Sequence, residues 1–463
     1  MGLGIRGGGL GAAKFMAERG ARVTITDTRS KKELAPSLDA LRRFKNIRVV
    51  LGKHEKSDFT RADLIVKNPG VRPNSPYLLL AKSRRIPVTS DMGIFFMCAP
   101  ATLIGVTGTR GKSTTAHLIW KFLKTKNVRV FLGGNIGRKE SLLDSLENLK
   151  KGDIVVVELS SFQLWDIREN TFGGDGAGTG RKSPHIAVIT NILHDHLNWH
   201  GTMKEYEDAK RVIFQFQSPK DYLFANPRDP RVRNMARSAP SRVVYPRLPA
   251  AYKKLVDANI GAHYESSIAL AIAVARHFKI PAASVKKVLM EFRGLPGREE
   301  EICAINGIHF INDTTSTMPD AASAAIRRFR KKASHGKLIL IAGGMDKNLD
   351  FSEMAREVRK SVDTLVLLPG TGTEKLKNEL GIMNYELRIR KEESENFYEA
   401  TSMKEAVRTA YRRATKGDYI LLSPGATSFG LFLNEFDRGD KFKDEVNGIS
   451  SKFLRPKKNR PTA

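Results

Sequence analysis

One segment constrains the fold of this chain more than any other: an apolar run, ATLIGVTG at 101–108, leads directly into TRGKSTT. The run predicts a buried β-strand, and residues Lys112 to Lys124 predict a helix after a glycine-rich turn. In such a turn, backbone N–H groups and the helix N-terminus together bind a phosphate group. The spacing departs from the common phosphate-loop pattern, because Val106 rather than glycine stands five positions before Gly111. The segment still predicts a phosphate-binding loop.

Strand-like and helix-like segments alternate along the whole chain, and most of the expected strands end in glycine or in a polar cluster. Repeated strand–helix units favour parallel, doubly wound sheets, so the fold class is α/β. At roughly 150 residues per domain, 463 residues suggest about three domains, which we place at 1–96, 97–293 and 294–463. The expected strands are 21–28, 47–52, 62–70, 86–90, 101–108, 153–160, 185–192, 308–313, 337–344, 364–370 and 418–425; the clearest expected helices are 10–18, 112–124, 203–216 and 264–277.

The chain is strongly basic, with Lys and Arg exceeding Asp and Glu by 78 − 49 = 29. This excess is compatible with anionic substrates, and also with nucleic acid or an anionic membrane surface. The only concentrated basic piece is the tail, 451–463, which we expect to be solvated. No apolar run approaches the roughly 20 residues of a membrane span, and no signal-peptide pattern follows Met1. We expect a cytoplasmic protein without membrane insertion, with Cys98 and Cys303 as buried free thiols.

The N-terminus carries a second nucleotide-type motif. GLGIRG at 2–7 is a literal G-x-G-x-x-G, and Asp27 follows Gly7 by about 20 residues, as in dinucleotide-binding folds. The strand expected before this motif is missing from the sequence, because the motif begins directly after Met1. Either the first strand is absent, or the start lies upstream of Met1.

Several motifs together resemble those of the Mur ligases and their relative, folylpolyglutamate synthase. They are TGTRGKST (107–114), VELSSFQL (157–164), NILHDHLNWHG with YEDAK (191–210), GLPGREE (294–300), INDTTSTMPDA (311–321), GGMDKNLDF (343–351) and LLSPGATSFGLFLNEFDRGDKF (421–442). The last is most similar to the D-glutamate-adding branch. The resemblance implies a Rossmann-like UDP-binding domain, a central P-loop ATPase domain and a Rossmann-like C-terminal domain, working as a monomer. It also implies ATP, two Mg²⁺ ions, UDP-N-acetylmuramoyl-L-alanine and D-glutamate as ligands.

The resemblance assigns a role to individual residues. Lys112, Glu158, His196, Lys210 and Arg298 are the implied catalytic group, with Ser113, Glu158, His196 and a carbamylated Lys210 around the metals. The residues expected to contact ATP are Gly108, Thr109, Arg110, Gly111, Lys112, Ser113, Thr114, Arg298 and Asp313. The residues expected to contact the UDP-linked precursor are Gly4, Ile5, Arg6, Asp27, Thr28, Arg29 and Asn135. Those expected to contact D-glutamate are Thr317, Lys347 and Ser428.

The sequence also departs from the family pattern. Tyr264 and Ser267 replace asparagines near the adenine, Gly297 replaces a frequent histidine, and His194 stands where an acidic residue is common. The loop Phe172 to Gly180 has the composition of an insertion. These departures put substrate detail in doubt, but they leave the phosphate loop intact.

Four other interpretations remain open. A folate-type polyglutamate ligase shares the phosphate loop but should lack the UDP-type first domain. A nicotinamide-dependent oxidoreductase would explain GLGIRG but not GTRGKST. A basic nucleic-acid-binding P-loop protein would explain the charge and predicts salt-dependent binding, although the motifs make it the weaker hypothesis. An inactive, degenerate ligase would explain the departures.

Overall fold

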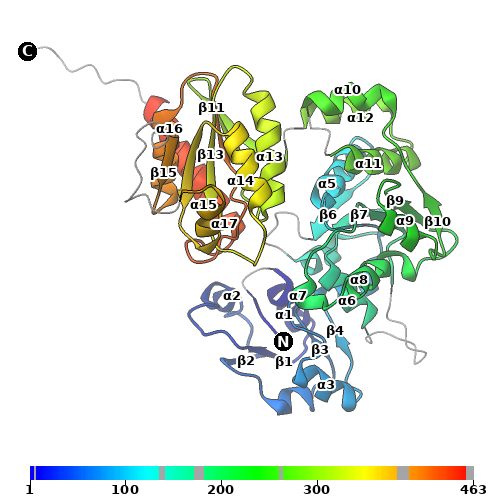
Figure 1. Cartoon of the computed structure of the whole chain (residues 1–463). Coiled ribbons are helices and arrows are strands. Elements are labelled where there is room, and N and C mark those ends of the chain that lie inside the picture. The colour runs from blue at the N-terminus through cyan, green and yellow to red at the C-terminus, as the bar shows by residue number, and fades with distance from the viewer. Residues whose placement is uncertain are drawn as a thin grey trace, which may run out of the picture. The chain divides into compact units, whose positions relative to one another are not determined.

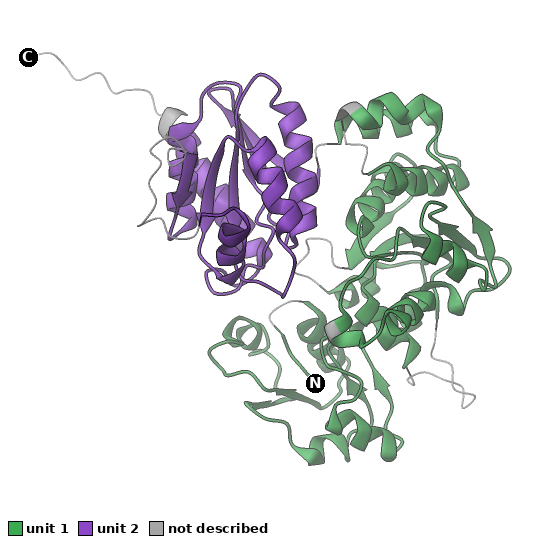
Figure 2. Ribbon diagram, in the orientation of Figure 1, with its two compact units in different colours: residues 1–292 green, residues 293–463 purple. Residues whose placement is uncertain are grey.

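The computed structural model describes residues 1–4, 7–134, 141–170, 182–259, 264–292, 294–382 and 396–454. The chain forms two compact units, Met1–Phe292 and Arg293–Ala463 (Figure 2). Ile5, Arg6 and Asn135, which the sequence assigned to the UDP-linked precursor, lie outside the described residues, as does the loop 172–180. The domain boundaries at 96 and 293 stay predictions.

The first part of unit 1 is built from short elements around two small parallel sheets, β1–β2 and β3–β4 (Figure 1). The expected strands at 21–28, 47–52, 62–70 and 86–90 are all present in shorter form. Among the described residues, the first element is helix α1. The elements are α1 (Gly7–Glu18), β1 (Val23–Asp27), α2 (Ala35–Asp39), β2 (Ile47–Leu51), η1 (Lys56–Phe59), β3 (Ile65–Val66), α3 (Pro76–Ser83), β4 (Val88–Thr89) and α4 (Asp91–Cys98).

The second part of unit 1 contains a six-stranded sheet, every pair of which is parallel, in the order β10-β9-β8-β5-β7-β6. Its central strands are mainly apolar, as expected for a parallel sheet that helices cover on both faces. The elements are β5 (Thr102–Thr107), α5 (Lys112–Leu123), β6 (Val130–Gly134), η2 (Leu142–Asn148), β7 (Ile154–Glu158), α6 (Ser161–Arg168), β8 (Ile186–Ile189), α7 (Leu197–His200), α8 (Met203–Gln215), β9 (Tyr222–Ala225), α9 (Pro230–Ala236), β10 (Arg242–Val244), α10 (Ala250–Asn259), α11 (Glu265–His277) and α12 (Ala282–Glu291).

Side chains that alternate along these strands form two separate cores. In β7, Val155 and Val157 pack with residues of α4, α6 and α8, whereas Ile154 and Val156 pack with residues of α5, α11 and α12. This alternation fixes the register, since a slip of one residue would exchange the two faces. Because β7, β5 and β8 are parallel neighbours, their carboxyl ends meet at one edge of the sheet, where ligands bind in α/β folds.

Unit 2 has one six-stranded sheet in the order β11-β12-β16-β13-β14-β15, with β11 antiparallel to β12 and the other pairs parallel. Helices α13 and α14 supply the core on one face, and α16 and α17 supply it on the other. The elements are β11 (Glu300–Ile305), β12 (Ile308–Asn312), α13 (Pro319–Lys332), β13 (Leu338–Gly343), α14 (Ser352–Ser361), β14 (Thr364–Leu368), α15 (Thr371–Glu379), β15 (Phe397–Glu399), α16 (Met403–Arg413), β16 (Tyr419–Leu422) and α17 (Glu435–Leu454).

Two expectations from composition can be compared with the structure. None of the helices in the described ranges combines the length and the apolar character needed to cross a membrane. The expectation that both cysteines are buried is wrong, because Cys98 is exposed and Cys303 is only partly covered. Cys98 is the last residue of α4, so its side chain falls at the end of an otherwise buried helix.

Candidate active site

The loop between β5 and α5 has the shape of a phosphate cradle, and two glycines make that shape possible. Gly108 has a φ of 146° and Gly111 a φ of 78°, both in a region that side chains disfavour. A Cβ on Gly108 would lie 1.9 Å from Thr190 Oγ1, and one on Gly111 would lie 2.4 Å from Ser267 Oγ. The loop therefore leads directly into the N-terminus of α5, the end of a helix that favours an anion.

Residues at the end of β8 hold this loop from the neighbouring strand. Thr190 Oγ1 donates to the carbonyl oxygen of Arg110 at 2.5 Å. The amide of Asn191 accepts from Arg110 N at 2.9 Å and donates to Arg110 O at 3.2 Å. Sequence reasoning missed both residues, although two polar residues at the end of the apolar run HIAVI were the available signal. We call this pair the Thr190–Asn191 clamp.

Two lysines contact the loop, and one of them is fully buried. Lys112 Nζ donates to Thr109 O at 2.8 Å. Lys210, on α8, donates from Nζ to Gly108 O at 2.8 Å and is only 1% exposed. Burial, and next the positive charge of Lys112, lower the pKa of Lys210 well below its ordinary value. The fold thus brings the two predicted lysines to one loop and favours an uncharged amine at Lys210.

Glu158 lies at the carboxyl end of β7, where the sequence predicted it. Its side chain is 2% exposed, and its Oε2 atom has no hydrogen-bond partner. In the ladder it lies opposite Val106 of β5, one residue before that strand ends. A buried carboxylate oxygen without a partner is costly unless a cation binds it. Ser113, in the first turn of α5, is also buried, so Glu158 and Ser113 fit a hard divalent cation.

Two of the histidines that follow β8, His196 and His200, have different surroundings. His196, the predicted metal ligand, has a side chain 45% exposed and packs against the ring of Phe162. His200 is buried, and its Nε2 atom lies 2.9 Å from Ser161 Oγ. Burial lowers the pKa of His200 to about 4. Among the described residues, no group of three or more His, Cys, Asp or Glu side chains is arranged to hold a metal.

In unit 2, Asp313 lies directly after β12 and is held by three donors. It accepts hydrogen bonds from Ser316 Oγ at 2.5 Å, Ser423 Oγ at 2.7 Å and Glu299 N at 3.1 Å. Burial raises the pKa of Asp313 to about 7, against the effect of the two hydroxyls. Arg438, which is fully buried, binds Thr314 next to it. This network fixes the loop and was not visible in the sequence.

The three residues assigned to D-glutamate lie on loops that follow three adjacent strands, β12, β16 and β13. Met345 and Thr427 form an isolated antiparallel bridge, which joins the loop of Lys347 to the loop of Ser428. Ser428 is buried and Lys347 is exposed. Thr317, which is partly exposed, follows Ser316, whose carbonyl oxygen accepts from Gly425 N at 2.9 Å. Arg298 lies shortly before β11 in the same unit and is half-buried.

At the N-terminal end, Asp27 closes β1 and is buried. It accepts from Gly4 N at 3.3 Å and from Arg29 Nη2 at 2.9 Å. Burial acts to raise its pKa, but the hydrogen bonds from Arg29 and Gly4 outweigh burial and hold the pKa of Asp27 below its ordinary value. Thr28 is exposed beside this pair. Asp27 is therefore an anionic carboxylate at the end of β1, hydrogen-bonded to Gly4 of the glycine-rich segment, and its assignment to the UDP-linked precursor stays a prediction.

Three family models match the chain in succession. Residues 1–90 match the MurD-like N-terminal domain of Mur ligases, 106–284 the Mur ligase middle domain, and 297–425 the Mur ligase glutamate ligase domain. A relative in Roseiflexus sp. (strain RS-1) is 37% identical, and the alignment covers 97% of this chain and 98% of the relative. This chain belongs to the Mur ligase family. The family resemblance, the three-domain α/β architecture and the expectation of an ATP-using ligase are thereby confirmed.

The relatives have a more specific name. The Roseiflexus protein is a UDP-N-acetylmuramoylalanine–D-glutamate ligase, and so is a relative in Borreliella burgdorferi (strain ZS7), 33% identical over 97% of each chain. Solved structures agree at the level of the fold. The MurC ligase of Thermotoga maritima aligns with a TM-score of 0.59 at 18% identity, covering 97% of this chain and 98% of that one. The MurF ligase of the same organism aligns with a TM-score of 0.55 at 15% identity, covering 92% of this chain and 95% of that one.

Proposed function

We propose that this chain joins D-glutamate to UDP-N-acetylmuramoyl-L-alanine in the synthesis of peptidoglycan precursors. One observation carries the proposal: the chain has a phosphate loop contacted by the buried Lys210, and it aligns over nearly its whole length with UDP-N-acetylmuramoylalanine–D-glutamate ligases. The γ-phosphoryl group of ATP moves to the alanine carboxylate and gives an acyl phosphate. The amine of D-glutamate then attacks the acyl carbon, phosphate leaves, and an amide bond remains.

The residues of unit 1 supply positive charge where phosphate charge is concentrated. Lys112 offsets charge on the β- and γ-phosphates, and the backbone N–H groups at the N-terminus of α5 hold them in position. Positioning and charge neutralisation are the main requirements of phosphoryl transfer. The assignment of Arg298 to the same phosphates stays a prediction.

Glu158 and Ser113 are the residues that we expect to hold Mg²⁺. When bound, the cation would neutralise phosphate charge and orient the transferred group. For a second ion, we propose that the uncharged amine of Lys210 adds to CO₂, forming an N–C bond and releasing one proton, which turns a neutral amine into an anionic carbamate. Asp195 and the exposed His196 lie on the loop between β8 and α7. The presence of two ions, and the place of His196 beside them, stay predictions.

The loops after β12, β16 and β13 suit a dicarboxylate. Lys347 offers an exposed cation, and Ser428 and Thr317 offer hydroxyl donors, which is the donor set that two carboxylates require. The bridge between Met345 and Thr427 keeps two of these loops in register. Because ATP and a UDP-linked precursor are its substrates, we place the enzyme in the cytoplasm; a monomeric state stays a prediction.

The deciding experiment is phosphate release from ATP and Mg²⁺ with UDP-N-acetylmuramoyl-L-alanine, adding D-glutamate, L-glutamate, meso-diaminopimelate or L-lysine in turn. We expect release only with D-glutamate. Lys112→Ala should reduce it by about a hundredfold or more, and Lys121→Ala, on the exposed side of the same helix, should not. Release with none of the amino acids, from folded protein that binds ATP, would overturn the proposal; stimulation by nucleic acid alone would favour the nucleic-acid-binding P-loop hypothesis.

The carbamate is tested separately. In ¹³C-bicarbonate, the wild-type protein should give a carbamate carbon signal that Lys210→Met lacks and that Lys204→Met, at the exposed start of the same helix, retains. A wild-type spectrum identical to that of Lys210→Met would remove the carbamate from the mechanism.

A further inference from the structure

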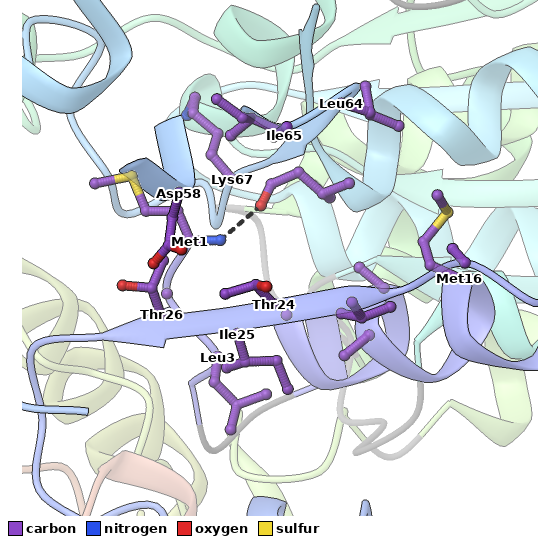
Figure 3. Close-up of a pocket in the computed structure, with 18 of the residues that line it drawn as sticks. Met1, Leu3, Met16, Thr24, Ile25, Thr26, Asp58, Leu64, Ile65 and Lys67 are labelled. Atoms are coloured by element: carbon purple, nitrogen blue, oxygen red, sulfur yellow. Dashed lines mark hydrogen bonds between the residues drawn. The ribbon is translucent and has the colours of Figure 1, made fainter. Parts of the chain in front are cut away.

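Two features of the described structure lie apart from the groups discussed above. The first is a cavity of about 630 Å³ in unit 1, lined by the mixed side chains of Met16, Thr24 and Lys67 among others (Figure 3); this mixture selects no class of ligand. The second is α15 in unit 2, which the sequence assigned to no site. Its first turn contacts residues 344–349, which we call the lysine loop because they carry Lys347.

The lysine loop and α15 meet at the same edge of the sheet of unit 2. The loop follows β13 and α15 follows β14, and these two strands are parallel neighbours. Their carboxyl ends therefore point the same way, toward the edge where ligands bind in α/β folds. The two backbones approach so closely that a Cβ on Gly370, just before α15, would overlap the carbonyl group of Gly344.

Hydrogen bonds from the first turn of α15 fix the backbone of the lysine loop. Gly344 N donates to Thr373 Oγ1 at 3.0 Å, and Gly344 O accepts from Gly372 N at 2.9 Å. Asp346 N, one residue before the lysine, donates to Thr371 Oγ1 at 3.0 Å. The hydroxyl of Thr373 is buried and donates in turn to the carbonyl oxygen at the end of β14 at 2.5 Å. The loop is therefore held in one place relative to the sheet.

Asp346 places a negative charge next to the lysine that was assigned to D-glutamate. Its side chain is 9% exposed, its Oδ2 atom pairs with Lys375 Nζ at 2.5 Å, and its Oδ1 atom accepts from Leu349 N at 3.0 Å. Burial acts to raise its pKa, but the hydrogen bonds from Lys375 and Leu349 outweigh burial and lower the pKa of Asp346 below its ordinary value. Both oxygens of this carboxylate are therefore engaged by groups other than Lys347.

This arrangement gives Lys375 a use beyond its own position. An uncompensated carboxylate beside Lys347 would compete with an incoming carboxylate for that lysine and would also repel it. The ammonium group of Lys375 offsets this charge, so the exposed Lys347 keeps its positive charge available. Because the side chain of Lys375 is 44% exposed, its ion pair contributes little to stability, and its effect on an anionic ligand is the larger one.

On the basis of the function proposed above, we propose that the first turn of α15 positions Lys347 for the carboxylates of D-glutamate, and that Lys375 contributes by neutralising Asp346. Thr371 and Thr373 fix the backbone of the lysine loop, while Lys375 removes the competing charge. These three are positioning residues, because they act through the loop rather than by touching the substrate.

The test measures the KM for D-glutamate in the phosphate-release assay. We expect Lys375→Met to raise this KM by about fivefold or more, while kcat and the KM for ATP change by less than about twofold. Adding Asp346→Asn should return the KM to within about twofold of the wild-type value, since asparagine keeps the acceptor for Leu349 N and carries no charge. Lys377→Met breaks the ion pair with Glu399 on the same helix and is the matched control, which should leave the KM unchanged.

A wild-type KM in Lys375→Met would overturn the proposal. A double variant no better than Lys375→Met would overturn it too, because the ion pair would then be structural. Salt provides an independent readout, since the Debye length falls from about 10 Å at 0.1 M to about 3 Å at 1 M. The ratio of the KM of Lys375→Met to that of the wild type should therefore shrink in 1 M KCl, and a constant ratio would exclude a charge effect.

The hydroxyl contacts are tested with a conservative pair of variants. Thr373→Ser keeps the acceptor for Gly344 N and should keep the KM for D-glutamate within about twofold, whereas Thr373→Val leaves that N–H without its acceptor and should raise the KM by about fivefold or more. Thr371→Val, at an exposed position, replaces Thr373→Val if the latter does not fold. Equal KM values for the serine and valine variants would overturn the role of α15. Failure of the proposed function looks different, because the wild-type protein would then release no phosphate on addition of D-glutamate.

Discussion

Replacing Glu158 with glutamine should separate two effects of its carboxylate: the free-energy cost of burying it, and its contribution to binding Mg²⁺. The side chain is 2% exposed, and its Oε2 atom has no hydrogen-bond partner in the described structure. An unsatisfied buried polar group costs about 1–3 kcal/mol, and a charged one costs more. Glutamine keeps the size but removes the charge, while its own amide still needs partners. We therefore expect Glu158→Gln to stabilise the ligand-free protein by about 1 kcal/mol, or roughly 2 °C in Tm.

When MgATP is bound, we expect the wild-type protein to be more stable than the Glu158→Gln variant. A ligand at a hundred times its Kd stabilises the folded state by about 2.7 kcal/mol. If Glu158 holds Mg²⁺ at the phosphates, the wild-type protein gains this stability from MgATP and the variant gains much less. The variant should then unfold above the wild type without ligand and below it with MgATP, and its phosphate release should fall by about a hundredfold.

Intrinsic fluorescence suits this assay, because all three tryptophans, Trp120, Trp165 and Trp199, lie in unit 1 with Glu158. Glu147→Gln is the matched control, since its side chain is 69% exposed and should change stability by less than about 0.5 kcal/mol. A lower Tm for ligand-free Glu158→Gln, together with an unreduced gain from MgATP, would refute the reasoning and make Glu158 a structural residue.

Four further substitutions test other parts of unit 1. Gly108→Ala places a Cβ 1.9 Å from Thr190 Oγ1 and should therefore distort the loop. We expect calorimetry to show at least about a tenfold loss of ATP affinity. A variant with wild-type affinity would show that the loop does not bind the phosphates. Burial lowers the pKa of His117 from 6.5 to about 4, so the folded state binds fewer protons than the unfolded state between these values. Stability then falls as pH drops through this window, and His117→Gln should flatten the curve of Tm against pH; an unchanged slope would count against it. Asp166→Asn leaves the buried ammonium of Lys67 without its carboxylate and should cost about 3–5 kcal/mol in urea unfolding. Lys67→Met should cost less, because burial raises the pKa of Asp166 to about 7 and the carboxyl group can take up a proton; equal costs would argue against this asymmetry.

Local patterns predicted the elements well. The run 101–108 contains β5, and the helix expected at 112–124 matches α5 within one residue. These follow from apolar periodicity and glycine, which act within a few residues. The position of Glu158 at a strand end was predictable for the same reason. The exposure of Cys98 was not, because it depends on what covers the end of α4.

Contacts between distant segments could not be predicted from patterns. Lys210 reaches Gly108 across 102 residues, and Asn191 reaches Arg110 across 81. Both depend on the packing of α8 and β8 beside β5, which no spacing in the sequence encodes. The resemblance placed Lys210 near the phosphates, but only the structure gives its burial and its lowered pKa. The assignments to Ile5, Arg6 and Asn135 lie outside the described residues and stay predictions.

The Thr190–Asn191 clamp has a consequence for how fast ATP binds. A loop that is held by its neighbouring strand keeps its shape when empty, so a nucleotide loses little free energy to ordering it. The rate of ATP capture should then depend on diffusion and charge rather than on a wait for the loop to fold. Substitutions of Thr190, directly after β8, should therefore change the rate of ATP binding without altering the loop sequence itself.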